Sequence, residues 1–277
     1  MKKILVPCDF SAPAQQAFKF AMDMAKASEG EVYVLNIIDL PILYETTFGI
    51  QPYFVDTNLI KEFKDDAHKK YDKLRSLFVH LTSPVSFHIL NGPVTPLICD
   101  FIKDHEIDLV VMGTHGSSGL KEYFIGSNTE KVVRYSSVPV FSIRQAPDLM
   151  HVRKIVFPSS LVLDQHEFVE KVKALQEFFN AVLHVLLINT RLKFKPDREI
   201  KALLEEFVKH YKLNNYTLNW RSEEFEQDGI IHFADEINAD MIAMGTHGRR
   251  GLTHFFSGSI AEDVMNRVAC PIWTYKL

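Results

Sequence analysis

The chain has 277 residues, which is enough for two ordinary domains or for one large domain at roughly 150 residues per domain. Hydrophobic residues make up 47% of it and charged residues 24%, values near those of average globular proteins, so collagen-like, disordered and coiled-coil classes are excluded. The net charge of −4 gives no broad basic field, and we therefore expect no nucleic-acid partner.

In the first half of the chain, short apolar runs alternate with stretches of helical periodicity. The runs predicted as strands are residues 4–7, 32–38, 87–90, 109–112 and 138–143. Two sets of apolar residues recur at helical spacing between them, namely Leu59, Phe63, Ala67, Leu74 and Phe78, then Leu97, Ile98 and Ile102. Strands that are apolar on both faces and separated by helices predict a parallel sheet covered on both sides.

A glycine-rich loop follows the predicted strand 109–112. Its pattern is Gly113-x-x-Gly116, nine residues, then Gly126-Ser127. The carboxyl edge of an open parallel sheet is the side on which ligands bind, and glycines let backbone amides approach an anion closely. Ser127 and Glu130 also have capping-box spacing. Two interpretations of this loop therefore stay open, namely that it caps the following helix or that it binds phosphate.

A domain boundary is predicted near residues 145–150, where the sequence Gln-Ala-Pro-Asp interrupts the periodicity. It gives two domains, residues 1–146 and 151–277. The strands predicted in the second are residues 155–158, 182–188, 216–220, 241–244 and 271–275. A helical face between its second and third strands is formed by Ile200, Leu203, Leu204, Phe207 and Tyr211.

The two halves repeat each other. Residues 112–126 read MGTHGSSGLKEYFIG, and residues 244–258 read MGTHGRRGLTHFFSG. The second loop has the same pattern as the first, with glycines at 245, 248 and 258 followed by Ser259. This self-similarity over a long fixed spacing predicts a tandem duplication.

These loops resemble those of the universal stress protein family, whose nucleotide-binding members carry a G-2x-G-9x-G-[ST] loop after their fourth strand. The sequence Pro7-x-Asp9-x-Ser11 also resembles the opening of that family. The resemblance implies two adenine nucleotide alpha hydrolase-like domains, each a doubly wound five-stranded parallel sheet of order 3-2-1-4-5. It further implies a regulatory or stress-response role.

Pairing of the two halves is implied as well. The last strand of each half is apolar and would lie at a sheet edge, which favours aggregation unless the edge is paired. Single-domain members of the family dimerise through this strand. We therefore expect an intramolecular pseudo-dimer, and a further homodimer stays open.

The resemblance implies that ATP, with or without a magnesium ion, binds between the first and fourth strands. The matching residues of the first half are Pro7, Asp9, Ile37, Gly113, Gly116, Gly126, Ser127 and Asn128. The loop positions that match in the second half are Gly245, Gly248, Gly258 and Ser259. Ser160 stands there in place of Asp9, and Val162 in place of Ser11, so we expect a weaker or altered second site.

The remaining candidate residues have simpler interpretations. His115 and His247 occupy the same loop position and are expected to be scaffold groups, not catalytic bases. Arg249 and Arg250 can add positive charge beside a bound anion. Cys8 is expected to pack at a strand end, although a lowered pKa would make it a sensor of oxidants.

No catalytic residue and no metal site made of protein side chains is predicted. A Walker loop, a GxSxG elbow, paired carboxylates and zinc-type Cys or His spacing are all missing from the sequence. We therefore predict an ATP-binding protein without rapid turnover. A slow ATPase or nucleotidyl-transfer enzyme, and an interaction protein that binds no nucleotide, are the alternatives.

A cytoplasmic location is predicted from two observations. The three cysteines are too few and too scattered for a disulfide framework. The first apolar run is too short for a signal peptide, and no run approaches the roughly 18 apolar residues of a membrane span, so no membrane partner is expected.

Overall fold

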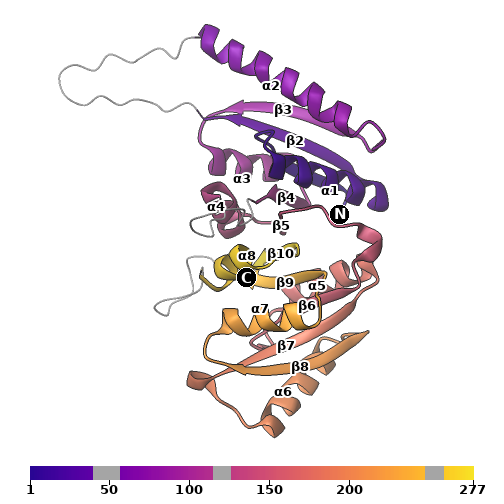
Figure 1. The fold of residues 1–277 in the computed structure, drawn as a ribbon, viewed down its shortest axis with the longest axis vertical. Coiled ribbons are helices and arrows are strands. Elements are labelled where there is room, and N and C mark those ends of the chain that lie inside the picture. Colours follow the sequence, from indigo (N-terminus) through magenta and orange to yellow (C-terminus); the bar gives the residue numbers. More distant parts are fainter. Residues whose placement is uncertain (40–56, 115–125, 247–258) are drawn as a thin grey trace, which may run out of the picture.

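The computed structural model describes residues 1–39, 57–114, 126–246 and 259–277 (Figure 1). The strands of the first half are β1 (Lys3–Pro7), β2 (Glu31–Ile38), β3 (Val85–Asn91), β4 (Leu109–Gly113) and β5 (Val140–Ile143). Those of the second half are β6 (Lys154–Pro158), β7 (Val182–Thr190), β8 (Tyr216–Glu223), β9 (Met241–Thr246) and β10 (Ile272–Lys276).

All these strands belong to one sheet of ten strands, in the order β3-β2-β1-β4-β5-β10-β9-β6-β7-β8. Within each half every pair of neighbouring strands is parallel. The predicted order 3-2-1-4-5 is therefore confirmed in both halves. Figure 1 shows the sheet running along the long axis of the molecule, with β3 at one end and β8 at the other.

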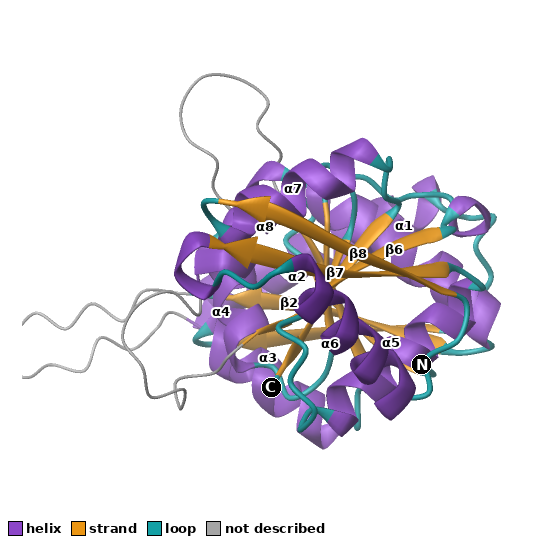
Figure 2. Cartoon of the chain, turned by 90° about the horizontal axis from the view of Figure 1, so that it is seen from below, coloured by secondary structure: helices purple, strands orange, loops and turns teal. Residues whose placement is uncertain are grey.

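Helices cover both faces of the sheet (Figure 2). Their bounds are α1 (Ala12–Ser28), α2 (Thr57–Leu77), α3 (Val94–Asp104), α4 (Ser127–Tyr135), α5 (His166–Phe179), α6 (Asp197–His210), α7 (Glu226–Glu236) and α8 (Ser259–Arg267). Short 3-10 turns are formed by Leu149–His151 and Arg191–Lys193. Buried side chains of α1, α2, α5 and α6 share one hydrophobic core, and those of α3, α4, α7 and α8 share the other. Each core is continuous across the two halves.

The two halves meet where β5 and β10 pair as antiparallel strands. Trp273 lies directly opposite Phe141, and both side chains are buried. The hydroxyl of Thr274 donates to the carbonyl of Val140 at 3.2 Å. Arg144 reaches across the junction and donates from its guanidinium to the carbonyl of Met265 at 3.1 Å. The apolar last strands thus cover each other's edges, as the sequence predicted, and they join the two sheets into one.

Helix α2 departs from its expected packing. The predicted helical spacing is correct, but only Ala67 and Leu74 of its apolar set are buried, while Leu59 and Phe63 are 41% and 42% exposed. The helix lies over β3, an outermost strand of the sheet, and Tyr71 stacks on Phe87 of that strand with ring centroids 4.2 Å apart. Only the part of the helix from Ala67 onward therefore meets the core.

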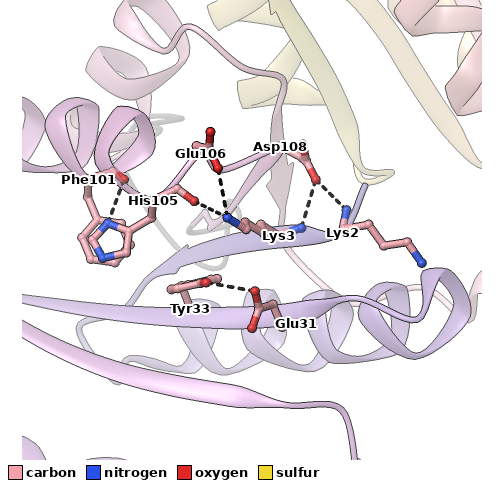
Figure 3. Close-up of polar contacts among 8 residues, drawn as sticks. All are labelled: Lys2, Lys3, Glu31, Tyr33, Phe101, His105, Glu106 and Asp108. Atoms are coloured by element: carbon pink, nitrogen blue, oxygen red, sulfur yellow. Dashed lines mark hydrogen bonds and ion pairs between the residues drawn. The ribbon is translucent and has the colours of Figure 1, made fainter.

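The amino edge of the sheet is held by a polar network (Figure 3). One oxygen of Asp108 accepts hydrogen bonds from the backbone amides of Lys2 at 2.6 Å and Lys3 at 3.0 Å. The Lys3 ammonium donates to the carbonyl of His105, just beyond α3, at 3.0 Å. A cation at a helix C-terminus complements the helix dipole, so the network fixes both the start of β1 and the end of α3.

The second half repeats this network at the matching positions. Asp240 accepts from the amides of Arg153 and Lys154 at 2.8 and 2.9 Å, and the Lys154 ammonium donates to the carbonyl of Ile237 at 2.7 Å. The duplication therefore extends to the hydrogen bonds of the amino edge. These bonds stabilise the edge opposite to the glycine loops. No helix among the described residues combines the length and the apolarity needed to cross a membrane.

Candidate functional site

The candidate site of the first half lies at the carboxyl ends of β1 and β4. These neighbouring strands are parallel, with Ile4 paired to Leu109 and Leu5 to Val110. From β1 the sheet grows through β2 in one direction, and from β4 it grows through β5 in the other. This is the point where strand order reverses, and ligands of open α/β sheets bind beside it.

The turn after β1 places a carboxylate at this point. Asp9 is exposed, and its Oδ1 accepts from the amide of Ser11 at 3.0 Å. Phe10 between them has a φ of 65°, in the left-handed region. Ser11 is the N-cap of α1, and its Oγ accepts from the amide of Ala14 at 3.4 Å. One carboxylate oxygen of Asp9 thus builds the turn, and the other has no partner among the described residues.

Two contacts tie this turn to β2. The amide of Cys8 donates to the carbonyl of Leu35 at 2.8 Å, and the Asn36 side chain donates to the carbonyl of Cys8 at 2.8 Å. Burial raises the pKa of the Cys8 thiol to about 12. The thiol is therefore protonated at neutral pH, which supports packing over oxidant sensing. Asn36 was not among the predicted site residues, and its signal in the sequence is an amide side chain inside an otherwise apolar strand.

Gly113 ends β4 against the first turn of α1. A Cβ atom at this position would lie 2.2 Å from the carbonyl carbon and oxygen of Pro13 and 2.7 Å from the amide nitrogen of Ala14. No other residue fits here without moving backbone. Gly113 thus brings the start of α1 onto β4, a packing role that its loop pattern did not reveal.

Gly126 is the N-cap of α4, and a Cβ atom there would meet nothing within 4 Å. Ser127 and Asn128 follow in the first turn, and both are exposed. Among the described residues, no side chain caps the start of this helix. The positive end of the α4 dipole and its first amides therefore lie at the carboxyl edge without a partner from that part of the chain.

The structure does not form the capping box that the spacing of Ser127 and Glu130 left open as one interpretation. The helix begins one residue too early for it, because Gly126 is the N-cap and Ser127 is already helical. The Glu130 carboxylate instead accepts from the Arg134 guanidinium at 2.9 Å. Among the described residues the Ser127 hydroxyl has no partner, so capping does not explain this serine.

The remaining candidates of the first half lie on the strands beside the turn. Pro7 ends β1 and pairs with Leu35, while Ile37 is half-buried on β2 and pairs with Leu90 of β3. Gly116 lies outside the described residues, and so do Gly248 and Gly258, His115 and His247, and Arg249 and Arg250. Ser259 begins α8, and only its backbone is described.

The second half builds the same turn with different chemistry. The amide of Ser159 donates to the carbonyl of Leu186 at 2.9 Å, as Cys8 does to Leu35. Leu161 has a φ of 60° and donates from its amide to the Ser159 hydroxyl at 3.0 Å. Ser160 is exposed where the first half has Asp9. This turn therefore offers hydroxyls in place of a carboxylate.

The surroundings of Gly245 also differ from those of Gly113. A Cβ atom on Gly245 would lie 2.8 Å from the side chain of Leu277, not against helix backbone. Among the described residues, no group of three or more His, Cys, Asp or Glu side chains could hold a metal ion.

Comparison with known proteins identifies both halves. The model of the universal stress protein family matches residues 1–144 and again residues 151–276. Universal stress protein Slr1230 of Synechocystis is 20% identical over the whole length of both chains. Universal stress protein MJ0531 of Methanocaldococcus jannaschii is 28% identical over 145 residues, which cover 52% of this chain and 82% of that protein.

A solved structure gives the same result for the fold. The crystal structure of a universal stress protein from Archaeoglobus fulgidus matches 99% of this chain and 98% of its own, with a TM-score of 0.77 at 20% identity. The similarity thus extends over both halves and their arrangement. The chain belongs to the universal stress protein family, as a member with two tandem domains.

Proposed function

We propose that the chain binds ATP in its first half, between the carboxyl ends of β1 and β4, and that nucleotide occupancy serves a regulatory role in a stress response. The observation that carries this is the open start of α4 beside the same sheet edge as the Asp9 carboxylate. Uncapped helix N-termini bind phosphate, and an exposed carboxylate accepts hydrogen bonds from ribose hydroxyls.

Each part of the nucleotide has residues that suit it. Pro7, Asp9 and the backbone of Ile37 form the adenosine side in this proposal. The ribose is assigned to the carboxyl end of β4, beside Gly113, where the first turn of α1 packs onto the strand. The phosphates are assigned to the second part of the loop, by Gly116, Gly126, Ser127 and the amide of Asn128.

A magnesium ion would accompany the triphosphate. Mg²⁺ binds oxygen ligands and is usually held by one or two carboxylates together with substrate phosphates. The Ser127 hydroxyl and the oxygens of the phosphates fit that chemistry, and no acidic cluster among the described residues competes with them. The ion is therefore assigned to the bound nucleotide and not to a separate protein site.

Binding without rapid turnover follows from the side chains at this edge. Hydrolysis needs a group that accepts a proton from the attacking water. Among the described residues, Cys8 is held in its protonated form, one oxygen of Asp9 builds the turn and the other is assigned to the ribose, which leaves no proton acceptor at the phosphates. The second half, with Ser160 in place of the carboxylate, is assigned an altered site. We place the domains at residues 1–146 and 151–277 and the protein in the cytoplasm.

Calorimetric titration with ATP and Mg²⁺ tests the proposal on the full chain. Asp9→Asn keeps an oxygen that can build the turn but removes the charge, and should weaken binding by about tenfold or more, as expected for loss of a charged hydrogen bond. Ser160→Ala, at the matching position of the second half, is the control and should bind as the wild type does.

Two results would refute the proposal. One is wild-type affinity in Asp9→Asn, and the other is no ATP binding by the unmodified chain. Nucleotide released from the purified protein by denaturation separates the alternatives. ATP indicates binding without turnover, whereas ADP formed from added ATP indicates a slow ATPase.

A further inference from the structure

The second half contains a cavity of about 430 Å³ at the carboxyl ends of β6, β7 and β9. Its volume lies within the range of about 300–1,000 Å³ that is usual for small-molecule sites. Aliphatic side chains form much of the lining, with Leu186 and Ile188 from β7, Met244 from β9, Ile230 from α7 and Ala261 from α8.

The space exists because α5 begins later than α1. Helix α1 starts five residues after Pro7, whereas α5 starts eight residues after Pro158, and the helices have 17 and 14 residues. In the first half the extra turn presses its backbone onto Gly113. In the second half that turn is absent, and Gly245 meets only the Leu277 side chain. The missing turn thus leaves room beside the strand ends.

The polarity of this space also differs from that of the first site. Ser160 replaces the carboxylate of Asp9. Leu187 replaces Asn36 as the residue directly after the one whose carbonyl accepts from the turn, Leu186 in the second half and Leu35 in the first. Leu187 lines the cavity, whereas Asn36 binds the backbone of the turn. At the position of Asp9 a ribose would therefore meet a serine hydroxyl, and the carboxylate that lines this cavity, Glu226, is already paired with Lys193, while an aliphatic chain would find aliphatic side chains.

The two lysines that line the cavity come from one short segment after β7. Asn189 is only 4% exposed, and its side chain accepts from the amide of Lys195 at 2.9 Å and donates to the Lys195 carbonyl at 3.0 Å. This pair of bonds fixes residues 191–195 over the end of β7. Two lysines of that segment, Lys193 and Lys195, line the cavity, and Phe194 between them is 68% exposed.

Both lysines can change partners at little cost. Lys193 pairs with Glu226 at 3.1 Å, and Lys195 pairs with Glu199. All four side chains are at least one-third exposed. Exposed ion pairs of this kind contribute little to stability, so an incoming carboxylate can replace either glutamate.

From this arrangement we propose that the cavity of the second half binds a linear, medium-chain acyl carboxylate. Its aliphatic chain lies against Leu186, Ile230 and Met244, and its carboxylate pairs with Lys193 and Lys195. Such a molecule is polar at one end only, which matches a cavity whose two lining lysines come from one short segment. The second half would then be a sensor for an acyl anion, separate from the nucleotide site of the first half.

Calorimetry on the full chain with octanoate, decanoate and dodecanoate, below their micelle concentrations, tests the apolar wall. Each added methylene should lower Kd about twofold to fourfold as long as it stays inside the cavity. The matched alcohol, 1-decanol, should bind more weakly than decanoate, and the stoichiometry should be one per chain.

Variants test the charged side. Lys193→Gln and Lys195→Gln should each weaken decanoate severalfold and leave 1-decanol unchanged. Ser160→Asp, at an exposed position, should weaken decanoate by repulsion. Lys201→Gln is the matched control, because Lys201 is an exposed lysine of α6 that does not line the cavity.

Four outcomes overturn the inference: no binding of the carboxylates, no dependence on chain length, equal affinity for acid and alcohol, or lysine variants that bind as the wild type does. Asp9→Asn separates this site from the proposed ATP site, since it should retain decanoate binding. Displacement of decanoate by ATP in that variant would also contradict the assignment, because it would place nucleotide in the second cavity.

Discussion

Gly113 and Gly126 belong to the same loop pattern, yet the structure predicts opposite effects when each is replaced. At Gly113 an added Cβ would lie 2.2 Å from the backbone of Pro13. The contact is with backbone and not with a flexible side chain, so the start of α1 must move. Overpacking usually costs about 1–3 kcal/mol, and we place Gly113→Ala at the upper end of that range.

At Gly126 the added atom meets nothing, and the residue has a φ of −54°, which any L-residue adopts. Alanine is a somewhat poorer N-cap than glycine but restricts the unfolded chain more, so the two small effects oppose each other. We expect Gly126→Ala to change the free energy of unfolding by less than about 0.5 kcal/mol. Gly126→Val should also fold, but its branched side chain would occupy the approach to the α4 amides.

Urea denaturation followed by circular dichroism measures the first effect, and ATP titration of the folded variants measures the second. We expect Gly113→Ala to have a lower free energy of unfolding than the wild type. Gly126→Val should be as stable as the wild type but should no longer bind ATP. Wild-type stability in Gly113→Ala would refute the close approach of α1 to β4. Wild-type ATP affinity in Gly126→Val would refute the placement of the phosphates.

Three other predictions concern groups away from the nucleotide. Burial raises the pKa of Cys8 and Cys270 to about 12, so both thiols should resist Ellman's reagent at pH 8 until the chain is unfolded; fast reaction of the native protein would contradict this. Burial and a hydrogen bond to Glu167 raise the pKa of Tyr275 to about 12, above its unfolded value near 10. The folded state therefore holds this proton more tightly, and stability should fall by up to about 3 kcal/mol between pH 10 and 12. Tyr275→Phe should flatten that part of the denaturation profile, and an unchanged slope would count against the shift. Trp273→Ala should cost about 3–5 kcal/mol, measured by urea denaturation, because the side chain is buried at the junction of the halves; a loss below about 1 kcal/mol would show that the junction contributes little.

The sequence predicted the sheet well because the signals for it are local and occur twice. Parallel strands buried on both faces appear as apolar runs in the sequence. The repeated glycines Gly113 and Gly245 mark the end of the fourth strand in each half, so the strand found in one half locates the matching strand in the other. Most observed strands extend the predicted ones by one to three residues, whereas β5 begins two residues later than predicted and β10 is shifted by one. β7, for example, continues to Thr190 through Asn189, whose polarity suggested the end of the strand but whose side chain is buried against Lys195.

The details of the two sites could not be predicted in the same way, because they depend on residues distant in sequence. The spacing of Ser127 and Glu130 left helix capping open, and the structure decides against it because α4 begins at Ser127, with Gly126 as its N-cap. The role of Gly113 depends on Pro13, a hundred residues earlier, and the cavity depends on where α5 begins relative to β9. Hydrophobic periodicity locates a helix but fixes its first turn poorly, and in this fold the first turn determines what lies beside each strand end.

The junction also determines how the two sites must be studied. Separating the halves would leave β5 and β10 as bare edge strands and would expose Trp273 and Phe141, which now cover each other. An isolated half would therefore pair with another copy or aggregate, and any affinity measured on it would include that association. Matched substitutions in the full chain, at Asp9 for the first site and at Lys195 for the second, leave the junction intact. Differences between them then report on the sites themselves.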